Sequence, residues 1–210
     1  MFINNDKGIV FAHNPKTAGS YVHIVLKDWV GLRGAERSDP EPIIHHQPLK
    51  EILAQNPAAK SYYKFTCVRN PWERTLSMYC DFTQNRGNIY SGKIHTDKPL
   101  LSEFKDFTEF VINLESSGWV NDIHLSPQHT YTHIDGVQVI DYIMRHENFA
   151  ADFQIVREKF NIQMSDRNAN TKHRPSKHGK YTDHYNDETA KVISKIYEQD
   201  IKLLGYTYGG

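Results

Sequence analysis

The segment from Gly8 to Trp29 has the sequence GIVFAHNPKTAGSYVHIVLKDW. Its residues 9–12 form a continuous apolar run that ends just before Asn14-Pro15, a pattern typical of a short strand buried on both faces. From Val22 onward, apolar residues recur at spacings of three and four, as on one face of an amphipathic helix. The segment therefore predicts a strand, a turn, and a helix that begins between residues 17 and 20.

The turn at residues 13–20 has a lysine, two hydroxyls and a glycine where a helix exposes its first N–H groups. Such N–H groups and the helix dipole attract an anion, glycine lets the backbone approach it, and Lys16 adds a charge. In Walker A the lysine follows the second glycine, so the order found here disfavours an ordinary ATP or GTP site. The alternative is a plain turn with a solvated lysine. The residues that we predict for a phosphate cradle are Lys16, Thr17, Ala18, Gly19 and Ser20.

A second unit of the same kind begins at residue 62. Residues 62–68 are aromatic and β-branched, which predicts a strand. After Arg69, the run Asn70-Pro71-Trp72-Glu73 has a capping residue, then proline and glutamate at positions that favour a helix start. Arg69 at the strand end would form a second anion site with Arg74 and Ser77 on one helix face; the alternative is ordinary surface ion pairs. Two such units predict a parallel sheet with a ligand crevice at its edge.

Length and composition limit the possibilities. We expect a single domain covering residues 1–210. Lysine plus arginine equals aspartate plus glutamate at 25 each, so we expect no nucleic-acid partner. No long apolar run or signal-like start is present, which favours a cytoplasmic protein without a membrane segment. Cys67 and Cys80 are expected to be reduced thiols, and the twelve histidines lack metal-ligand spacing, so we expect no metal.

The two motifs together resemble the PAPS-dependent sulfotransferase family of the carbohydrate type. The first motif is HNPKTAGS at residues 13–20, and the second is FTCVRNPWERTLS at residues 65–77. Enzymes of this family use 3'-phosphoadenosine 5'-phosphosulfate (PAPS) as donor. The resemblance implies a three-layer α/β fold, with a central, mostly parallel sheet flanked by helices and a P-loop-like nucleotide-binding site.

The resemblance also implies roles for single residues. The loop around Lys16 would hold the 5'-phosphosulfate, while Arg69 and Ser77 would hold the 3'-phosphate. His46, which begins the run HQPLKEI, matches the position of the catalytic base better than His45 does. The run SKHGKY at residues 176–181 is similar to a late loop that closes over the cofactor. Its matching residues are Lys177 and Tyr181, although a solvated basic loop remains the alternative.

The expected reaction moves a sulfuryl group from PAPS to an acceptor hydroxyl, on a carbohydrate by the resemblance, and leaves adenosine 3',5'-bisphosphate. His46 would take the acceptor proton, and Lys16 would stabilise charge on the leaving phosphate. Residues 84–99 are the expected acceptor loop, and the sequence leaves the acceptor and the oligomeric state open. Two alternatives remain. A nucleotide kinase would need a magnesium-holding carboxylate, for which Asp81 and Asp141 are nearest, and a non-catalytic binding module would tolerate the loss of His46.

Overall fold

The computed structural model describes residues 1–31, 46–84, 98–165 and 178–210. The chain divides into two compact units, which are described separately. The first comprises residues 1–69 and 130–174, and the second comprises residues 70–129 and 175–210. None of the helices in the described ranges is long and apolar enough to cross a membrane.

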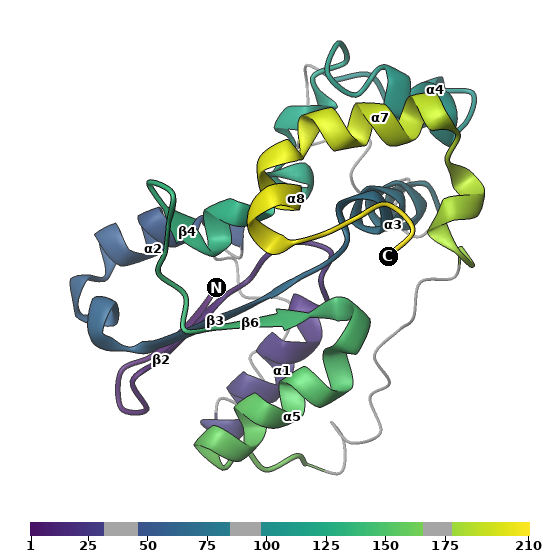
Figure 1. The fold of residues 1–210 in the computed structure, drawn as a ribbon. Coiled ribbons are helices and arrows are strands. Elements are labelled where there is room, and N and C mark those ends of the chain that lie inside the picture. The colour runs from purple at the N-terminus through teal and green to yellow at the C-terminus, as the bar shows by residue number, and fades with distance from the viewer. Residues whose placement is uncertain (32–45, 85–97, 166–177) are drawn as a thin grey trace. The chain divides into compact units, whose positions relative to one another are not determined.

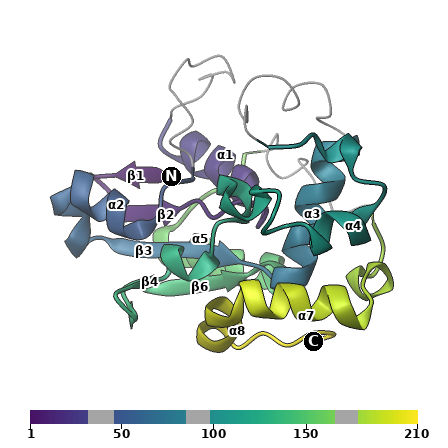
Figure 2. The same ribbon diagram turned by 90° about the horizontal axis from the view of Figure 1, so that it is seen from above.

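The first unit is built on a four-stranded sheet of order β1-β2-β3-β6, which Figure 2 shows side by side. Strands β2, β3 and β6 run parallel, and β1 joins β2 antiparallel. The strands are β1 (Phe2–Asn4), β2 (Ile9–Ala12), β3 (Tyr63–Val68) and β6 (Tyr142–Arg145). The parallel core of the sheet was predicted from the sequence, but the edge strand β1 was not.

Helices cover both faces of this sheet (Figure 1). Because successive strand residues point to opposite faces, Ile9 and Phe11 pack in one cluster and Val10 and Ala12 in another. The first cluster includes residues of α1 and α5, and the second includes residues of α2. These helices are α1 (Gly19–Trp29), α2 (Leu49–Gln55) and α5 (Phe149–Phe160). The predicted three-layer α/β arrangement, with a mostly parallel sheet, is confirmed.

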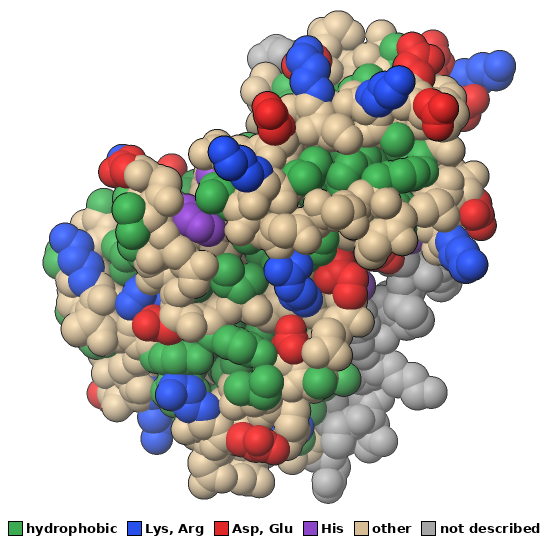
Figure 3. Space-filling view, viewed as in Figure 1, with side chains coloured by type: hydrophobic (Ala, Val, Ile, Leu, Met, Phe, Trp, Pro, Cys, Tyr) green, Lys and Arg blue, Asp and Glu red, His purple; other side chains and the backbone are tan. Residues whose placement is uncertain are grey.

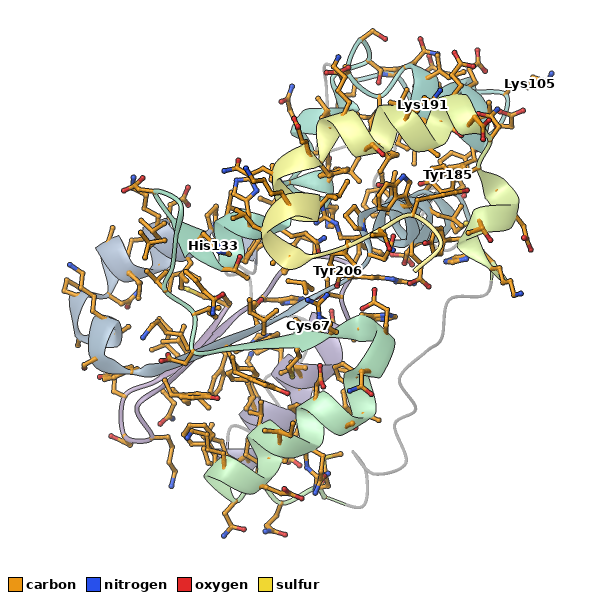
Figure 4. The ribbon with its side chains drawn as sticks, viewed as in Figure 1. Cys67, Lys105, His133, Tyr185, Lys191 and Tyr206 are labelled. Atoms are coloured by element: carbon orange, nitrogen blue, oxygen red, sulfur yellow. The ribbon has the colours of Figure 1, made fainter. Side chains whose placement is uncertain are left out.

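The second unit is helical. It contains α3 (Pro71–Gln84), α4 (Phe107–Ile112), α7 (Asp187–Ile196) and α8 (Glu198–Leu204). Aromatic rings fill its interior, and Phe110 lies within 5.2 Å of Tyr79 and 6.1 Å of Trp119 between ring centres. Tyr185, labelled in Figure 4, donates its hydroxyl to the carbonyl of Trp72 at 2.8 Å.

The first unit also has a small hairpin of β4 (His133–Ile134) and β5 (Val137–Gln138).

Two details of the helices differ from what apolar spacing predicts. Apolar spacing predicts a helix that Ser102 caps and that includes Phe104, but α4 begins at Phe107, and Asp106 caps it by accepting from Glu109 N at 2.9 Å. Apolar spacing also predicts one last helix from about Asp187, with Val192, Ile196 and Leu203 on its buried face. The structure divides this segment into α7 and α8, and other residues are buried. The buried residues of this segment are Thr189, Ile193, Tyr197, Asp200 and Leu204. Two of them are polar, so apolar spacing alone could not find this face.

Candidate active site

The loop between β2 and α1, which the sequence predicts as an anion cradle, has an unusual backbone. Lys16 and Ala18 both have left-handed conformations, with φ of 64° and 67°, on either side of Thr17. A non-glycine residue in this region costs about 1 kcal/mol or more, so two such residues in one loop are a feature that its surroundings must enforce. Alternation of left- and right-handed residues turns successive N–H groups into one concavity that binds anions. Ala18 is also the N-cap of α1, so the helix dipole adds to the effect.

Side chains from the loop and from β3 hold this backbone in place. Asn14 Nδ2 donates to the carbonyl of Cys67 at 3.0 Å, and Thr17 Oγ1 donates to the carbonyl of Asn14 at 2.8 Å. Arg69, at the end of β3, donates from Nη1 to the carbonyl of Lys16 at 3.3 Å. Asn14 and Thr17 are fully buried, and Arg69 is 2% exposed. The cradle is therefore attached to the carboxyl end of the neighbouring parallel strand, where α/β sheets bind ligands.

Gly19, the first residue of α1, has a structural role that the sequence did not suggest. A Cβ atom at this position would overlap the imidazole of His13. The His13 ring is buried, stacks on Phe11 with centres 5.7 Å apart, and lies directly over the start of the helix. Glycine is thus required here for the close approach of a side chain, in addition to any approach of a phosphate.

His46 lies beside the same loop. Its Nδ1 is 3.0 Å from the carbonyl oxygen of His13, and the two rings meet edge to face with centres 4.5 Å apart. A carbonyl can only accept, so this contact selects the tautomer with a proton on Nδ1. Nε2 then has the lone pair that a general base needs. The structure therefore brings together, within the first unit, the predicted base, the cradle residues and Arg69.

The other predicted residues belong to the second unit or lie outside the described residues. Ser77 is partly exposed on α3. Tyr181 begins a 3₁₀ turn, and its hydroxyl receives bonds from Asn70 Nδ2 at 3.2 Å and Gly209 N at 2.7 Å. Lys177, His45 and most of the expected acceptor loop lie outside the described residues.

The two arginines of the second motif are not surface ion-pairing residues, because both are buried. Arg74 donates from Nη2 to the carbonyl of Ser126 at 2.8 Å, and its guanidinium lies 5.3 Å from the centre of the Tyr197 ring. These contacts give Arg74 a role in packing the second unit. Asn70 acts as the predicted cap of α3, since its Oδ1 accepts from Trp72 N at 3.1 Å.

Three further features bear on the chemistry. Burial raises the pKa of the Cys67 thiol, so this residue on β3, labelled in Figure 4, stays protonated. Figure 3 shows Lys and Arg interspersed with Asp and Glu on the face in view, in keeping with the balanced charge. Among the described residues, no group of three or more His, Cys, Asp or Glu side chains is placed to hold a metal ion.

Comparison with known proteins agrees with this geometry. The model of the Sulfotransferase family matches residues 1–207. The chain belongs to the sulfotransferase family. No curated protein and no solved structure matches it.

Membership of the sulfotransferase family implies transfer of a sulfuryl group to a hydroxyl-bearing acceptor. The fold also argues against Asp141, one of the two carboxylates that could hold magnesium in the kinase alternative. Asp141 precedes β6 and so lies at the amino end of the parallel strands, opposite to the cradle. Its Oδ2 accepts from Lys64 N at 2.7 Å and lies 3.2 Å from Lys64 Nζ.

Three further residues of this candidate site have no role that the sequence alone assigns. The sequence indicates a turn at Asn14-Pro15, but not that the Asn14 side chain is fully buried and donates to β3. His13 had no role assigned, and nothing in the spacing indicates that its ring covers Gly19. Tyr131, from the 3₁₀ turn Gln128–Tyr131, donates its hydroxyl to the carbonyl of His46 at 2.7 Å. That contact spans 85 residues and has no local signature.

Proposed function

We propose that this sulfotransferase uses PAPS as donor, transfers its sulfuryl group to a carbohydrate hydroxyl, and releases adenosine 3',5'-bisphosphate. The acceptor oxygen attacks sulfur, the bond between sulfur and the bridging phosphate oxygen breaks, and the acceptor proton passes to the base. Such an in-line displacement depends mainly on positioning and on stabilisation of spread negative charge.

In this proposal His46 is the base. Its Nδ1–H donates to the His13 carbonyl, so Nε2 accepts the proton of the acceptor hydroxyl. An imidazole suits the task because its ordinary pKa of about 6.5 lies near neutral pH. The Nδ1 contact also stabilises the imidazolium that forms, since it becomes a hydrogen bond from a charged donor.

Lys16 and the N–H groups of residues 17–20 would bind the 5'-phosphosulfate and stabilise the charge that develops on the leaving phosphate. The two left-handed residues support this role, because they preorganise the loop before any ligand binds. Preorganised donors need no rearrangement in the transition state, which is the source of their catalytic effect.

Arg69 and Ser77 would bind the 3'-phosphate, and Lys177 and Tyr181 would contact the cofactor. Burial of Arg69 beside the cradle supports its part, because a guanidinium shielded from water binds phosphate more strongly. The proposal also includes a carbohydrate as the acceptor and a cytoplasmic location. The two thiols, Cys67 and Cys80, fit a reducing compartment.

The observation that supports this function most strongly is the short chain of contacts from His46 through the His13 carbonyl to the strained cradle loop. Titration calorimetry of the purified protein tests it, with adenosine 3',5'-bisphosphate in one experiment and ATP plus magnesium in the other. We expect the bisphosphate to bind without metal and more tightly. Preference for ATP with magnesium, or binding of neither, would refute the donor assignment.

Turnover of PAPS with a panel of sugars then tests the base. We expect His46→Ala to keep its affinity for the bisphosphate and to lose about 10²–10⁴-fold in kcat, the usual contribution of a general base. Lys16→Ala should lower the rate of the chemical step as well. His133→Ala is a control, because His133 is a histidine of the β4–β5 hairpin and is not one of the proposed site residues. Unchanged turnover in His46→Ala would show that another base acts.

A further inference from the structure

We propose that Tyr131 is a positioning residue for the base: its buried hydroxyl holds the backbone of His46 so that the imidazole keeps its bond to His13. This inference rests on the proposed function, because it concerns the base of that reaction. Tyr131 would not touch either substrate.

The contact itself is well defined. Tyr131 Oη donates to the carbonyl oxygen of His46 at 2.7 Å, the usual distance for a hydrogen bond from a hydroxyl. The Tyr131 side chain is fully buried and belongs to the core cluster that includes Leu49 and Ile52 of α2. A tyrosine ring has few rotatable bonds, so a hydroxyl at its end is a rigid donor.

His46 needs such support because of its place in the chain. It precedes Pro48, the N-cap of α2, and so lies outside the hydrogen-bond ladder of that helix. Its side chain is held at Nδ1 by the carbonyl of His13, from the end of β2. Tyr131 therefore provides a second point of attachment, on the backbone, from a separate element of the same unit.

Two points of attachment restrict the imidazole more than one does. With the Nδ1 bond alone, the imidazole can rotate about that bond without breaking it. Fixing the backbone of His46 as well prevents this rotation. Without the Tyr131 hydroxyl, the carbonyl of His46 loses a buried donor and the residue can shift toward other donors. Loss of the Nδ1 contact would then let the proton move to Nε2, which removes the base.

The expected effect is on the chemical step and not on donor binding. A small misplacement of a catalytic group lowers the rate by about tenfold to a hundredfold. We therefore expect Tyr131→Phe to lower kcat by about that factor while the KM for PAPS stays within about twofold, since the cradle is untouched.

Tyr197→Phe is a matched control. Tyr197 is also buried, and its hydroxyl also donates to a backbone carbonyl, that of Leu125, at 2.8 Å. Both variants therefore remove the same atom from the same kind of bond, but Tyr197 belongs to the second unit and not to the His46 contact. The inference would be supported if both variants lose the same thermal stability but only Tyr131→Phe loses kcat. An equal kcat in the two variants would overturn it.

A spectroscopic measurement separates this inference from the proposed function. Long-range ¹H–¹⁵N NMR of histidine-labelled protein at about pH 8, above the usual histidine pKa, reports which ring nitrogen of His46 is protonated. We expect the proton on Nδ1 in the wild type and in Tyr197→Phe, and a shift toward Nε2 in Tyr131→Phe. An unchanged tautomer in Tyr131→Phe would overturn the inference even if PAPS turnover is found.

The tautomer result is also decisive if the protein proves not to bind the bisphosphate, since it needs no substrate. If Tyr131→Phe does not fold, the wild type alone is tested in the same way. A proton on Nε2 of His46 in the wild type would overturn the inference, and a proton on Nδ1 would support it.

Discussion

At the scale of single residues, close packing around the cradle restricts the amino acids that it accepts. Gly19 is in contact with the His13 imidazole, and that ring is buried against Phe11. The space for the His13 ring exists only because Gly19 has no side chain. Since the carbonyl of His13 also holds His46, a change at the helix start can reach the base through His13.

Gly19→Ala is therefore expected to destabilise the protein by about 1–3 kcal/mol, the usual cost of overpacking a buried site. The measurement is urea unfolding of Gly19→Ala, His13→Ala and the double variant. Because His13→Ala removes the overlapping ring, the double variant should be more stable than the sum of the two effects predicts, by about 1 kcal/mol or more. Strict additivity would mean that the His13 ring does not lie over Gly19.

The contact of Arg69 with the Lys16 carbonyl and its proposed contact with the 3'-phosphate can be separated. Arg69→Ala should weaken binding of adenosine 3',5'-bisphosphate by about tenfold to a hundredfold, the value of a charged hydrogen bond. It should weaken binding of adenosine 5'-monophosphate much less, because that ligand lacks the 3'-phosphate. Calorimetry with both ligands measures the difference.

Equal losses for the two nucleotides would show that Arg69 acts only through the Lys16 carbonyl, 3.3 Å from its Nη1. Arg157→Ala is the control variant. Arg157 is an arginine of α5 in the same unit that also donates to a backbone carbonyl, that of Ile162 at 3.4 Å. Its removal should leave both affinities unchanged.

At the scale of elements, the loop between β2 and α1 combines strained backbone conformations with hydrogen bonds that hold them. Lys16 and Ala18 have left-handed backbones, while bonds from Asn14, Thr17 and Arg69 hold the loop. Conformations of this kind persist only where the surroundings enforce them, and they are common at ligand-binding sites. The loop therefore holds strained backbone conformations at some cost to stability, as the proposed binding of an anion there would require.

This strain can be measured at Ala18, whose side chain makes no capping bond. Ala18→Gly should raise the free energy of unfolding by up to about 1 kcal/mol, because glycine adopts the left-handed region without penalty. Ala54→Gly, at an exposed position of α2 in the same unit, should lower it by about 1 kcal/mol. Denaturant unfolding of both variants gives the comparison. Similar losses of unfolding free energy in the two variants would show that Ala18 is not strained.

At the scale of the whole molecule, stability at acid pH depends on carboxylates whose pKa differs between the folded and the unfolded chain. Asp122 is 1% exposed and accepts from His124 Nδ1 at 2.9 Å and Lys98 Nζ at 3.2 Å. Burial alone would raise the pKa of Asp122, but the hydrogen bonds from His124 and the nearby charges outweigh it and hold the pKa well below its usual value.

A lowered pKa in the folded state means that the unfolded chain binds the proton first as the pH falls. The stability due to the Asp122 charge is therefore complete above about pH 4, the usual pKa of an aspartate, and is lost as the pH falls below that value. We expect Asp122→Asn to be less stable at pH 7 and to lose less stability than the wild type between pH 5 and pH 2. Urea unfolding at several pH values measures both slopes, and parallel slopes would contradict the assignment.

Local sequence was sufficient for much of the fold. The apolar run at residues 9–12, the helical spacing from Val22, and the cap at Asn70 each concern neighbouring residues, and the structure has β2, α1 and α3 at these places. Gly205 follows the last apolar positions of the chain's final helical segment, which predicts a helix end there, and Gly205, with φ of 69°, ends α8. These features depend on backbone geometry within a few residues, which is why one sequence can show them.

The sequence by itself determined the α/β class, the two strand-to-helix motifs and the family to which the chain belongs. Only the tertiary structure decided that His13 covers Gly19, that Arg69 donates to the Lys16 carbonyl, and that Tyr131 holds His46. The His13 ring meets Gly19 because of how the turn closes onto α1, and the other two contacts join residues 53 and 85 positions apart. The physical reason is that such contacts depend on strand order and on side-chain packing, and neither leaves a periodic pattern in the chain.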